Sequence, residues 1–443
     1  MLPVKYLLPI VATFSVCLLA IQYNFETISF ISVWKRSNIT YQPPISQVNF
    51  NNFYKNHRKQ QSKISTSWEA CRNRKNPENK AFGAQPDTYD QVLNSTRNEF
   101  DLALKERGSK PLVILFYNKG IDKFNPPKYP WKALGAQGRT DKARCSSNCL
   151  FTLDNRMISC ADLVVVHHAW GKLVVRHLKW LRDQNKLVPW AWIEHESPAN
   201  SRGQSRLKEL FQLTASYSRS SDLWVPYGKV LRKEKPDTSG TGVDHAKAKS
   251  KKVIAFMSNC VGYRIKFIRQ LKKHVEIDFF GSCNGNAFCP RNSNNCEDKQ
   301  KQYKFFLALE NSFCEDYHTE KLYWQGYTKE LIPITFFDYD ELKNKPFLVP
   351  APKSFINIFD FPNMEALADH LNYLSNNDTA YNEYHAWRND FTVRGMDRCS
   401  LCEEAHKIDV KEKRGLPTIK IEEVWNQTKC IGYNKELFQK YLK

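Results

Sequence analysis

Residues 304–322 read KFFLALENSFCEDYHTEKL, in which an apolar run of strand length is followed by a loop dense in polar side chains. A short apolar run bounded in this way is typical of a buried strand, and the spacing of residues 319–330 after the loop is helical. A strand, a loop and a helix in this order form the repeating unit of α/β proteins. We therefore predict an α/β fold with this loop at the carboxyl end of a strand, which is where such sheets bind ligands.

The same alternation extends to both sides of this unit. On the amino-terminal side, PLVILFY, ADLVVVHH and VPWAWIE have strand length, and KLVVRHLKWLRDQ between the last two has helical spacing. Residues 231–252 are charged, contain Gly and Ser, and interrupt the pattern as a linker or surface loop. The strand VIAFM (253–257), the helix YRIKFIRQLKKH and the strand VEIDFF then precede the quoted unit, and IPITFF follows it. The sequence thus predicts two α/β domains.

The first residues indicate a membrane anchor. The run YLLPIVATFSVCLLAIQY (6–23) carries no charge over 18 residues, which is about the minimum length for a membrane-spanning helix. No small-x-small cleavage site clearly follows it, which favours an uncleaved signal anchor over a cleaved signal peptide. We expect residues 1–5 to be a cytoplasmic tail, residues 24–110, which are rich in polar and basic residues, to be a stem, and the remaining chain to be lumenal.

Glycosylation sequons and cysteines agree with a lumenal location. Four N-x-[ST] sequons occur, at Asn38, Asn94, Asn377 and Asn426. Of 13 cysteines, Cys17 lies in the apolar run, and the even number that remains suits disulfides in an oxidising compartment. A zinc site formed by the pairs CSSNC (Cys145, Cys149) and CSLC (Cys399, Cys402) is the alternative, although no suitably spaced histidine accompanies them.

The net positive charge of the chain does not by itself indicate a nucleic-acid partner. The formal net charge is +20, which would suit nucleic acid or an anionic membrane. However, the Lys and Arg residues are dispersed, and the chain has neither zinc-finger spacing nor a sustained basic and aromatic pattern. We therefore expect no nucleic-acid partner.

Two cations lie where helices are expected to begin. Lys321 falls in the first turn after the polar loop, and Arg264 in the first turn after SNCVG. A cation there opposes the helix dipole by about 0.3–1 kcal/mol, and an anion between the two would reverse that sign. A diphosphate fits, with Arg264 binding it bidentately and Lys321 acting as a point charge. The alternative is an ordinary surface helix in which Glu320 caps the first turn and Lys321 faces solvent.

The remaining polar side chains of the loop suit a nucleotide sugar. Asn311 and Glu320 could hydrogen-bond ribose or sugar hydroxyls, and Tyr317 could stack or donate its hydroxyl. The catalytic carboxylate is expected elsewhere, in WAWIEHESPAN (190–200). Because side chains alternate along a strand, Glu194 shares a face with the tryptophans, whereas Glu196 lies at the strand end before Pro198. We favour Glu196 as the catalytic base. The alternative is that Glu196 has only a structural role and pairs with a nearby Lys or Arg.

The stretch LENSFCEDYHTEKL resembles the signature of α1,3-fucosyltransferases, in which Glu-Asn-Ser ends a strand and Asp-Tyr-x-Thr-Glu-Lys follows. TLDNRMISCADLVVVHH, WIEHESPANS, LFQLTASYSRSSDLWVPYG and FMSNCVGYRIKFIRQL resemble successive blocks of the family in the same order, as does the terminal Cys-x-x-Cys. The resemblance runs from about residue 111 to residue 402 and lapses in 231–252. One departure is LYWQGYTKELIPITFF, where bulky aromatic residues replace small ones.

This resemblance implies a GT-B fold, two Rossmann-like domains facing across a cleft, in a single-pass type II Golgi membrane enzyme. Its reaction would move L-fucose from GDP-β-L-fucose to the 3-hydroxyl of a GlcNAc in a glycoprotein glycan, either the N-glycan core or a LacNAc/LacdiNAc-type antenna, with inversion. Expected domains are 111–230 (acceptor side), 231–252 (linker or surface loop), 253–402 (GDP-fucose binding) and 403–443 (C-terminal extension). A catalytically silent glycan- or nucleotide-sugar-binding homologue, or a glycoside hydrolase using Glu194 with Glu196, is the alternative.

The resemblance also assigns site residues. It implies Glu196 as general base, Arg264 and Lys321 on the diphosphate, and Asn311, Tyr317 and Glu320 around the nucleotide. It implies disulfides Cys145–Cys399 and Cys149–Cys402, with the crossed pairing left open. We expect no tightly bound cofactor and no dedicated metal site, so that a divalent cation would at most stimulate. Asp338–Asp340 (DYD) is too short a motif to indicate metal binding, and His167 and His168 suit a strand end or an acceptor cleft.

Overall fold

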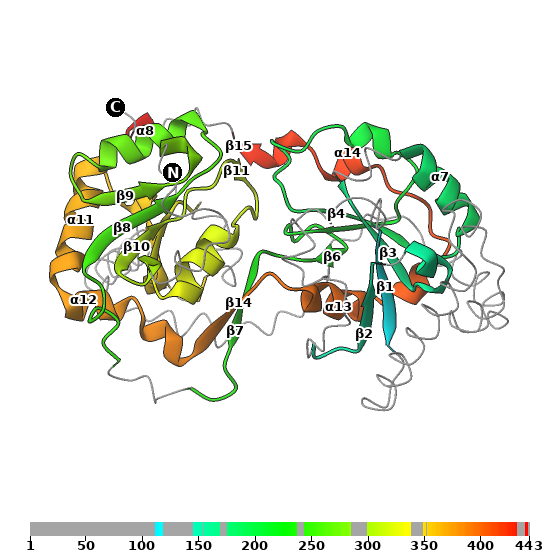
Figure 1. The fold of residues 1–443 in the computed structure, drawn as a ribbon, viewed down its shortest axis with the longest axis horizontal. Coiled ribbons are helices and arrows are strands. Elements are labelled where there is room, and N and C mark those ends of the chain that lie inside the picture. Colours follow the sequence, from blue (N-terminus) through cyan, green and yellow to red (C-terminus); the bar gives the residue numbers. More distant parts are fainter. Residues whose placement is uncertain are drawn as a thin grey trace, which may run out of the picture. The chain divides into compact units, whose positions relative to one another are not determined.

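The computed structural model describes residues 111–117, 145–153, 155–168, 175–236, 243–284, 299–337, 349–350, 352–431 and 439–441. All of them belong to one compact unit. Within these ranges most strands form two parallel sheets, each with its own helices (Figure 1), and the remaining strands form two antiparallel pairs. The predicted α/β fold with two sheets is confirmed.

The first sheet has six strands in the order β2-β1-β3-β4-β5-β6, and all neighbouring strands are parallel. The strands are β1 (Leu112–Tyr117), β2 (Cys149–Thr152), β3 (Leu163–His167), β4 (Trp190–Glu194), β5 (Leu213–Ser216) and β6 (Leu223–Trp224). Helix α7 (Val175–Gln184) and 3-10 turns at Asn155–Cys160 and Gln204–Leu207 connect them.

Both faces of this sheet are buried. Trp190 and Trp192 point into one core together with residues of α7, whereas Ala191 and Ile193 belong to a second core together with residues of helix α13 (Arg398–Lys407). A strand that is covered on both faces has no polar side to show, and this accounts for its nearly continuous apolar sequence. The expected alternation of side chains along β4 is confirmed.

The second sheet has five parallel strands in the order β13-β12-β10-β8-β9. Its strands are β8 (Lys251–Phe256), β9 (Ile277–Phe280), β10 (Tyr303–Leu307), β12 (Ile332–Thr335) and β13 (Ile356–Asn357), with helices α8 (Gly262–Leu271), α11 (Met364–Asn376) and α12 (Asp378–Glu383). Short 3-10 turns occur at Ser282–Asn284, Pro352–Ser354, Ile358–Asp360 and Ala386–Asn389. The chain leaves β8 towards β9 on one side and continues through β10 and β12 on the other. The carboxyl ends of β8 and β10 therefore form a topological switch point, where such sheets bind ligands.

The helix expected over residues 319–330 differs from the prediction. The structure has a π-helix at Lys321–Gly326, followed by a 3-10 turn at Tyr327–Lys329. Tyr323 and Tyr327 are buried in the core, and a Cβ on Gly228 would lie 2.2 Å from the Tyr323 ring. The aromatic residues that depart from the family pattern are thus accommodated by packing, and π-turns of this kind are frequent near functional sites.

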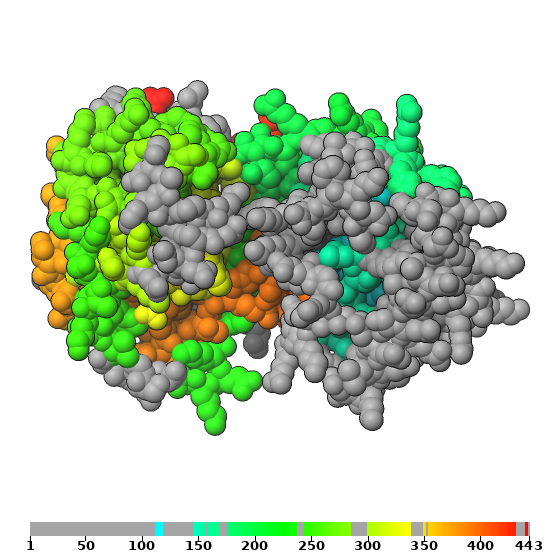
Figure 2. All heavy atoms as spheres, viewed as in Figure 1, coloured from blue at the N-terminus to red at the C-terminus, as the bar shows by residue number. Residues whose placement is uncertain are grey.

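The linker and the C-terminal extension also differ in their bounds. Strand β7 (Gly228–Arg232) pairs antiparallel with β14 (Phe391–Gly395), so the expected linker 231–252 begins inside one strand and ends inside β8. The expected boundary at residue 402 falls within α13. We call residues 391–431, from β14 to β15, the return segment. Figure 2 shows its first part in orange at the surface beside the green residues around β7.

The chain after β14 packs against the first sheet. Residues of α13 and Val410 belong to one of its cores, and Ile421 and Trp425 belong to the other. Helix α14 (Ile421–Val424), 3-10 turns at Val410–Lys413 and Gln427–Lys429, and β15 (Cys430–Ile431) follow. Strand β15 then pairs with β11 (Phe313–Cys314) in the polar loop. Tyr441 lies in the core of the second sheet.

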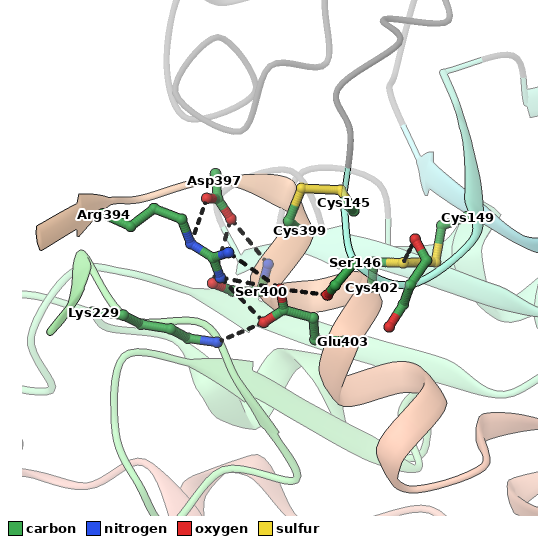
Figure 3. The surroundings of a disulfide bond; sticks show 11 residues. Cys145, Ser146, Cys149, Lys229, Arg394, Asp397, Cys399, Ser400, Cys402 and Glu403 are labelled. Atoms are coloured by element: carbon green, nitrogen blue, oxygen red, sulfur yellow. Dashed lines mark hydrogen bonds and ion pairs between the residues drawn. A yellow bond between two sulfur atoms is a disulfide. The ribbon is translucent and has the colours of Figure 1, made fainter. Parts of the chain in front are cut away.

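Disulfides fasten the return segment. Cys145–Cys399 and Cys149–Cys402 have the pairing that the resemblance implies, and they join α13 to the residues before and at the start of β2 (Figure 3). Glu403, in the same helix, accepts hydrogen bonds from Lys229 of β7 and Arg394 of β14. Between described residues the structure has two further disulfides, Cys260–Cys283 and Cys314–Cys430, whose pairing the sequence analysis does not predict.

No helix in the described ranges is long and apolar enough to cross a membrane. The expected anchor at 6–23, the tail and the stem lie outside these ranges, as do Asn38, Asn94 and Asp338–Asp340. Asn377 and Asn426 are described, and each is a partly exposed residue that caps a short helix.

Non-reducing peptide mapping should recover linked peptides for Cys145–Cys399 and Cys149–Cys402. Because each closes a loop of about 250 residues, removing one with a double Cys→Ser variant should lower the free energy of unfolding by about 2–5 kcal/mol. Free thiols at these four positions, or zinc bound to them stoichiometrically, would contradict the pairing.

Candidate functional site

Arg264 lies at the switch point, in the first turn of α8. Its side chain is only 2% exposed. One terminal nitrogen donates to the Leu309 carbonyl at 3.2 Å and the other to the Asn259 carbonyl, so the guanidinium joins the loops after β8 and β10. Its Nε is buried and has no hydrogen-bond partner among the described residues. Arg264 therefore places a positive charge with one unpaired N–H donor at the switch point.

Lys321 is brought to the same site. Its Nζ donates to Glu310 Oε2 at 3.1 Å, to Thr319 Oγ1 at 2.9 Å and to Glu320 Oε1 at 3.4 Å, and its side chain is 19% exposed. Burial alone would lower the pKa of Lys321, but Glu310 and Glu320 raise it above its usual value, while the charge of Arg264 opposes them. The alternative in which Lys321 simply faces solvent is therefore wrong.

Glu310 is a site residue that the sequence analysis missed. Its buried carboxylate accepts hydrogen bonds from the backbone and hydroxyl of Thr319 at 2.7 and 2.9 Å, and from Lys321. Its own carbonyl accepts from the Tyr263 hydroxyl on α8. The sequence does contain a signal for it, because Glu310 directly follows an apolar run. A carboxylate buried at such a position needs several hydrogen-bond donors, and this need indicates a polar site around it. Glu310 therefore fixes both ends of the polar loop.

Glu196 lies just beyond the end of β4, as predicted, and is half-buried. Its Oε1 accepts hydrogen bonds from Ser197 N at 2.9 Å, from the Tyr317 hydroxyl at 2.7 Å and from Asn311 Nδ2 at 3.2 Å. Neither Lys nor Arg forms an ion pair with Glu196 within the described part of the chain. The structure thus brings three predicted site residues together, with Asn311 and Tyr317 on the carboxylate itself.

Glu194 supports the turn that carries Glu196. It is 4% exposed, and its Oε1 accepts from the backbone N–H groups of His195 at 2.8 Å and Glu196 at 2.9 Å, while Oε2 accepts from Ser201 Oγ at 3.0 Å. Burial raises the pKa of Glu194 to about 7, although these hydrogen bonds oppose the shift. The rings of His167 and His168 approach the carboxylate from the end of β3, each with Nε2 at 3.9 Å.

Further hydrogen bonds join the loops of the two sheets. Ser312 Oγ lies 2.7 Å from Ser197 Oγ and accepts from Asn200 Nδ2 at 2.8 Å. The carboxylate of Asp316 accepts from Arg219 N at 2.9 Å and from Ser218 Oγ at 3.3 Å. The polar loop of the second sheet is thus held against the loops that follow β4 and β5.

The ionisation of Glu194 should make stability depend on pH. Because the folded pKa of about 7 lies above the ordinary glutamate value of 4.5, folding favours the protonated acid, and this stabilisation is present below pH 4.5 and is lost as pH rises through 7. Relative to Glu194→Gln, the wild type should lose up to about 3 kcal/mol of unfolding free energy between pH 5 and pH 8. Denaturant titrations at both pH values measure it, with exposed Glu276→Gln as control. Parallel pH dependences of wild type and Glu194→Gln would contradict the buried ionisation.

Comparisons with known proteins identify the family of the chain. Residues 109–228 match the model described as fucosyltransferase, N-terminal, and residues 246–421 match glycosyltransferase family 10 (fucosyltransferase) C-term. The chain is 33% identical to alpha-(1,3)-fucosyltransferase fut-1 of Caenorhabditis elegans over 72% of this chain and 70% of that protein. It is 30% identical to alpha-(1,3)-fucosyltransferase 7 of Rattus norvegicus over 58% of this chain and 67% of that protein.

A crystal structure of an alpha1,3-fucosyltransferase with GDP-fucose covers 70% of this chain and 92% of that chain at 18% identity. The TM-score between the two structures is 0.41. The matches to the two family models span both sheets and every residue of the candidate site. The chain therefore belongs to glycosyltransferase family 10, the fucosyltransferases.

Proposed function

We propose that this protein is an inverting α1,3-fucosyltransferase that moves L-fucose from GDP-β-L-fucose to the 3-hydroxyl of a GlcNAc residue in a glycoprotein glycan. One observation carries the proposal most directly: the carboxylate of Glu196 is hydrogen-bonded to the same polar loop that carries Lys321. Glycosyl transfer from a nucleotide sugar requires a base beside a diphosphate site, and here one loop contacts the base and carries the diphosphate site. The names of the relatives support fucose as the transferred sugar and the α1,3 linkage.

Arg264 and Lys321 provide the positive charge for the departing diphosphate. In the reaction, the bond between the fucose anomeric carbon and the diphosphate oxygen breaks, and negative charge grows on GDP. Two cations that are already fixed, one by backbone carbonyls and one by Glu310, stabilise that charge without reorganising. Glu320, whose side chain is partly exposed beside Lys321, is placed to contact hydroxyl groups of the donor.

Glu196 acts as the general base. The acceptor oxygen attacks the anomeric carbon, its proton passes to the Glu196 carboxylate, and GDP leaves, so that one displacement forms the α-linkage with inversion. A positioned base of this kind contributes typically about 10²–10⁴-fold to the rate. Glu194 is less suited to this role because its oxygens already accept hydrogen bonds from two backbone N–H groups and a serine hydroxyl.

The acceptor and the location remain part of the proposal. We infer an acceptor GlcNAc in the N-glycan core or in a LacNAc or LacdiNAc-type antenna, and a Golgi membrane location with the catalytic part in the lumen. The lumenal Golgi location is supported by the uncharged run at residues 6–23, the four sequons and the disulfides.

A transfer assay with labelled GDP-fucose and a panel of glycan acceptors tests this function. We expect fucose on O3 of GlcNAc by mass-spectrometric linkage analysis. Release of sugar from a glycan without nucleotide would instead indicate a glycoside hydrolase, and GDP binding without turnover would indicate a silent homologue.

The variant Glu196→Gln should keep GDP affinity and lose about 10²–10⁴-fold in kcat, because the amide preserves the shape of the side chain and removes the base. Glu194→Gln should reduce turnover less. Steady-state kinetics with GDP titration calorimetry on both variants measures this, and near-wild-type turnover by Glu196→Gln would refute the assignment.

The variants Arg264→Ala and Lys321→Ala should each weaken GDP binding roughly tenfold to a hundredfold, since each removes a charge-assisted contact of about 1.5–3 kcal/mol. Transfer should persist at least in part in EDTA, because these cations take the place of a metal. Unchanged GDP affinity in both variants would place the diphosphate elsewhere, and a complete loss of transfer that Mn²⁺ restores would indicate a metal site.

A further inference from the structure

Three hydrogen-bond donors converge on one oxygen of Glu196 and leave the other oxygen for the substrate. We propose that Tyr317, assisted by Asn311, is a positioning residue that orients the carboxylate of Glu196 so that Oε2 receives the acceptor proton. The inference rests on the proposed function and goes beyond it, because it gives Tyr317 and Asn311 a role on the base in place of the expected role around the nucleotide.

The two oxygens of Glu196 have different surroundings. Oε1 accepts from Ser197 N at 2.9 Å, from the Tyr317 hydroxyl at 2.7 Å and from Asn311 Nδ2 at 3.2 Å. Among the described residues, no hydrogen bond reaches Oε2, although Glu196 is only half-buried. An oxygen with three donors has no lone pair left for a new proton. Oε2 is therefore the oxygen that can accept the proton of a hydroxyl group.

Tyr317 is held in place as a hydrogen-bond donor to Glu196. Tyr317 is 4% exposed, and its ring lies against two tyrosines in loops of the first sheet. Its ring centroid is 5.0 Å from that of Tyr217 and 6.4 Å from that of Tyr227. Burial raises the pKa of the Tyr317 phenol well above its usual value, and the neighbouring Tyr227 and Glu196 raise it further. The phenol therefore remains a hydrogen-bond donor to Glu196.

A serine network sets the amide of Asn311. Ser312 Oγ donates its single proton to Asn311 Oδ1 at 3.0 Å, and it therefore accepts from Asn200 Nδ2 at 2.8 Å and from Ser197 Oγ at 2.7 Å. With its oxygen engaged, the Asn311 amide presents its N–H group to Glu196. The orientation of the carboxylate is thus set from both sheets.

This arrangement ties the base to the diphosphate site. One end of the polar loop holds Lys321 through Glu310 and Thr319, and the middle of the loop holds Glu196 through Tyr317. A displacement of the loop would therefore disturb the leaving-group site and the base together.

A double-mutant cycle on the whole protein tests the proposal. Tyr317→Phe removes only the hydroxyl, and we expect a roughly tenfold to hundredfold loss of kcat in fucose transfer, because the lost bond is to a charged group. GDP affinity should stay within about twofold. In the Glu196→Gln background, adding Tyr317→Phe should cause little further loss of the residual rate, since the two residues act as one unit.

Tyr381→Phe is the matched control. It removes a buried hydroxyl that donates to the Lys304 carbonyl in the second sheet, away from the site, and thermal melts of both variants separate lost stability from lost positioning. Asn311→Ala provides a second variant, with a smaller loss of kcat, should Tyr317→Phe fold poorly.

Two results would overturn the proposal: GDP affinity that falls tenfold in Tyr317→Phe with kcat preserved, or losses that multiply fully in the double variant. Both presuppose that the wild type transfers fucose. A wild type without transfer would refute the proposed function itself, and this inference with it.

Discussion

A hydrogen bond between Tyr317 and Glu196 joins the polar loop of the second sheet to the end of β4 in the first sheet, and the site depends on it. Each partner would be incomplete without the other. Glu196 would be a partly exposed carboxylate with few fixed contacts, and Tyr317 would be a buried hydroxyl without an acceptor, which costs free energy. The polar residues of the loop are therefore set both by their own strand and by the opposite sheet.

Three carboxylates of this site are held in different ways, and their chemistry differs accordingly. Glu310 is buried and accepts hydrogen bonds from the backbone and hydroxyl of Thr319 and from Lys321, and these contacts hold Lys321 in place. Glu194 is buried with N–H and hydroxyl donors, and burial raises its pKa to about 7. Glu196 alone keeps one oxygen without a hydrogen bond among the described residues and is partly exposed. Only this last environment suits proton transfer with a substrate.

The return segment explains how loops of two separate sheets can stay within hydrogen-bonding distance. After β14 the chain packs on the first sheet, is cross-linked there by Cys145–Cys399 and Cys149–Cys402, and then comes back to pair β15 with β11. Cys314–Cys430 fastens this last pair within the polar loop itself. Side-chain hydrogen bonds of modest strength can order a site when the backbone around it is already restrained.

The amino-acid sequence by itself determined the two parallel sheets, the place of Glu196 beyond β4, and the positions of Arg264 and Lys321 at helix starts. These follow from local periodicity and from the geometry of a strand that leads into a loop, so neighbouring residues suffice to predict them. Only the tertiary structure decided that Asn311 and Tyr317 contact Glu196, that Glu310 holds Lys321, and that α13 packs on the first sheet. Residues more than a hundred positions apart make several of these contacts, and no pattern within one segment records such distant partners. The π-helix at Lys321–Gly326 has the same origin, because the burial of Tyr323 and Tyr327 against distant parts of the chain overrides the local preference for a regular helix.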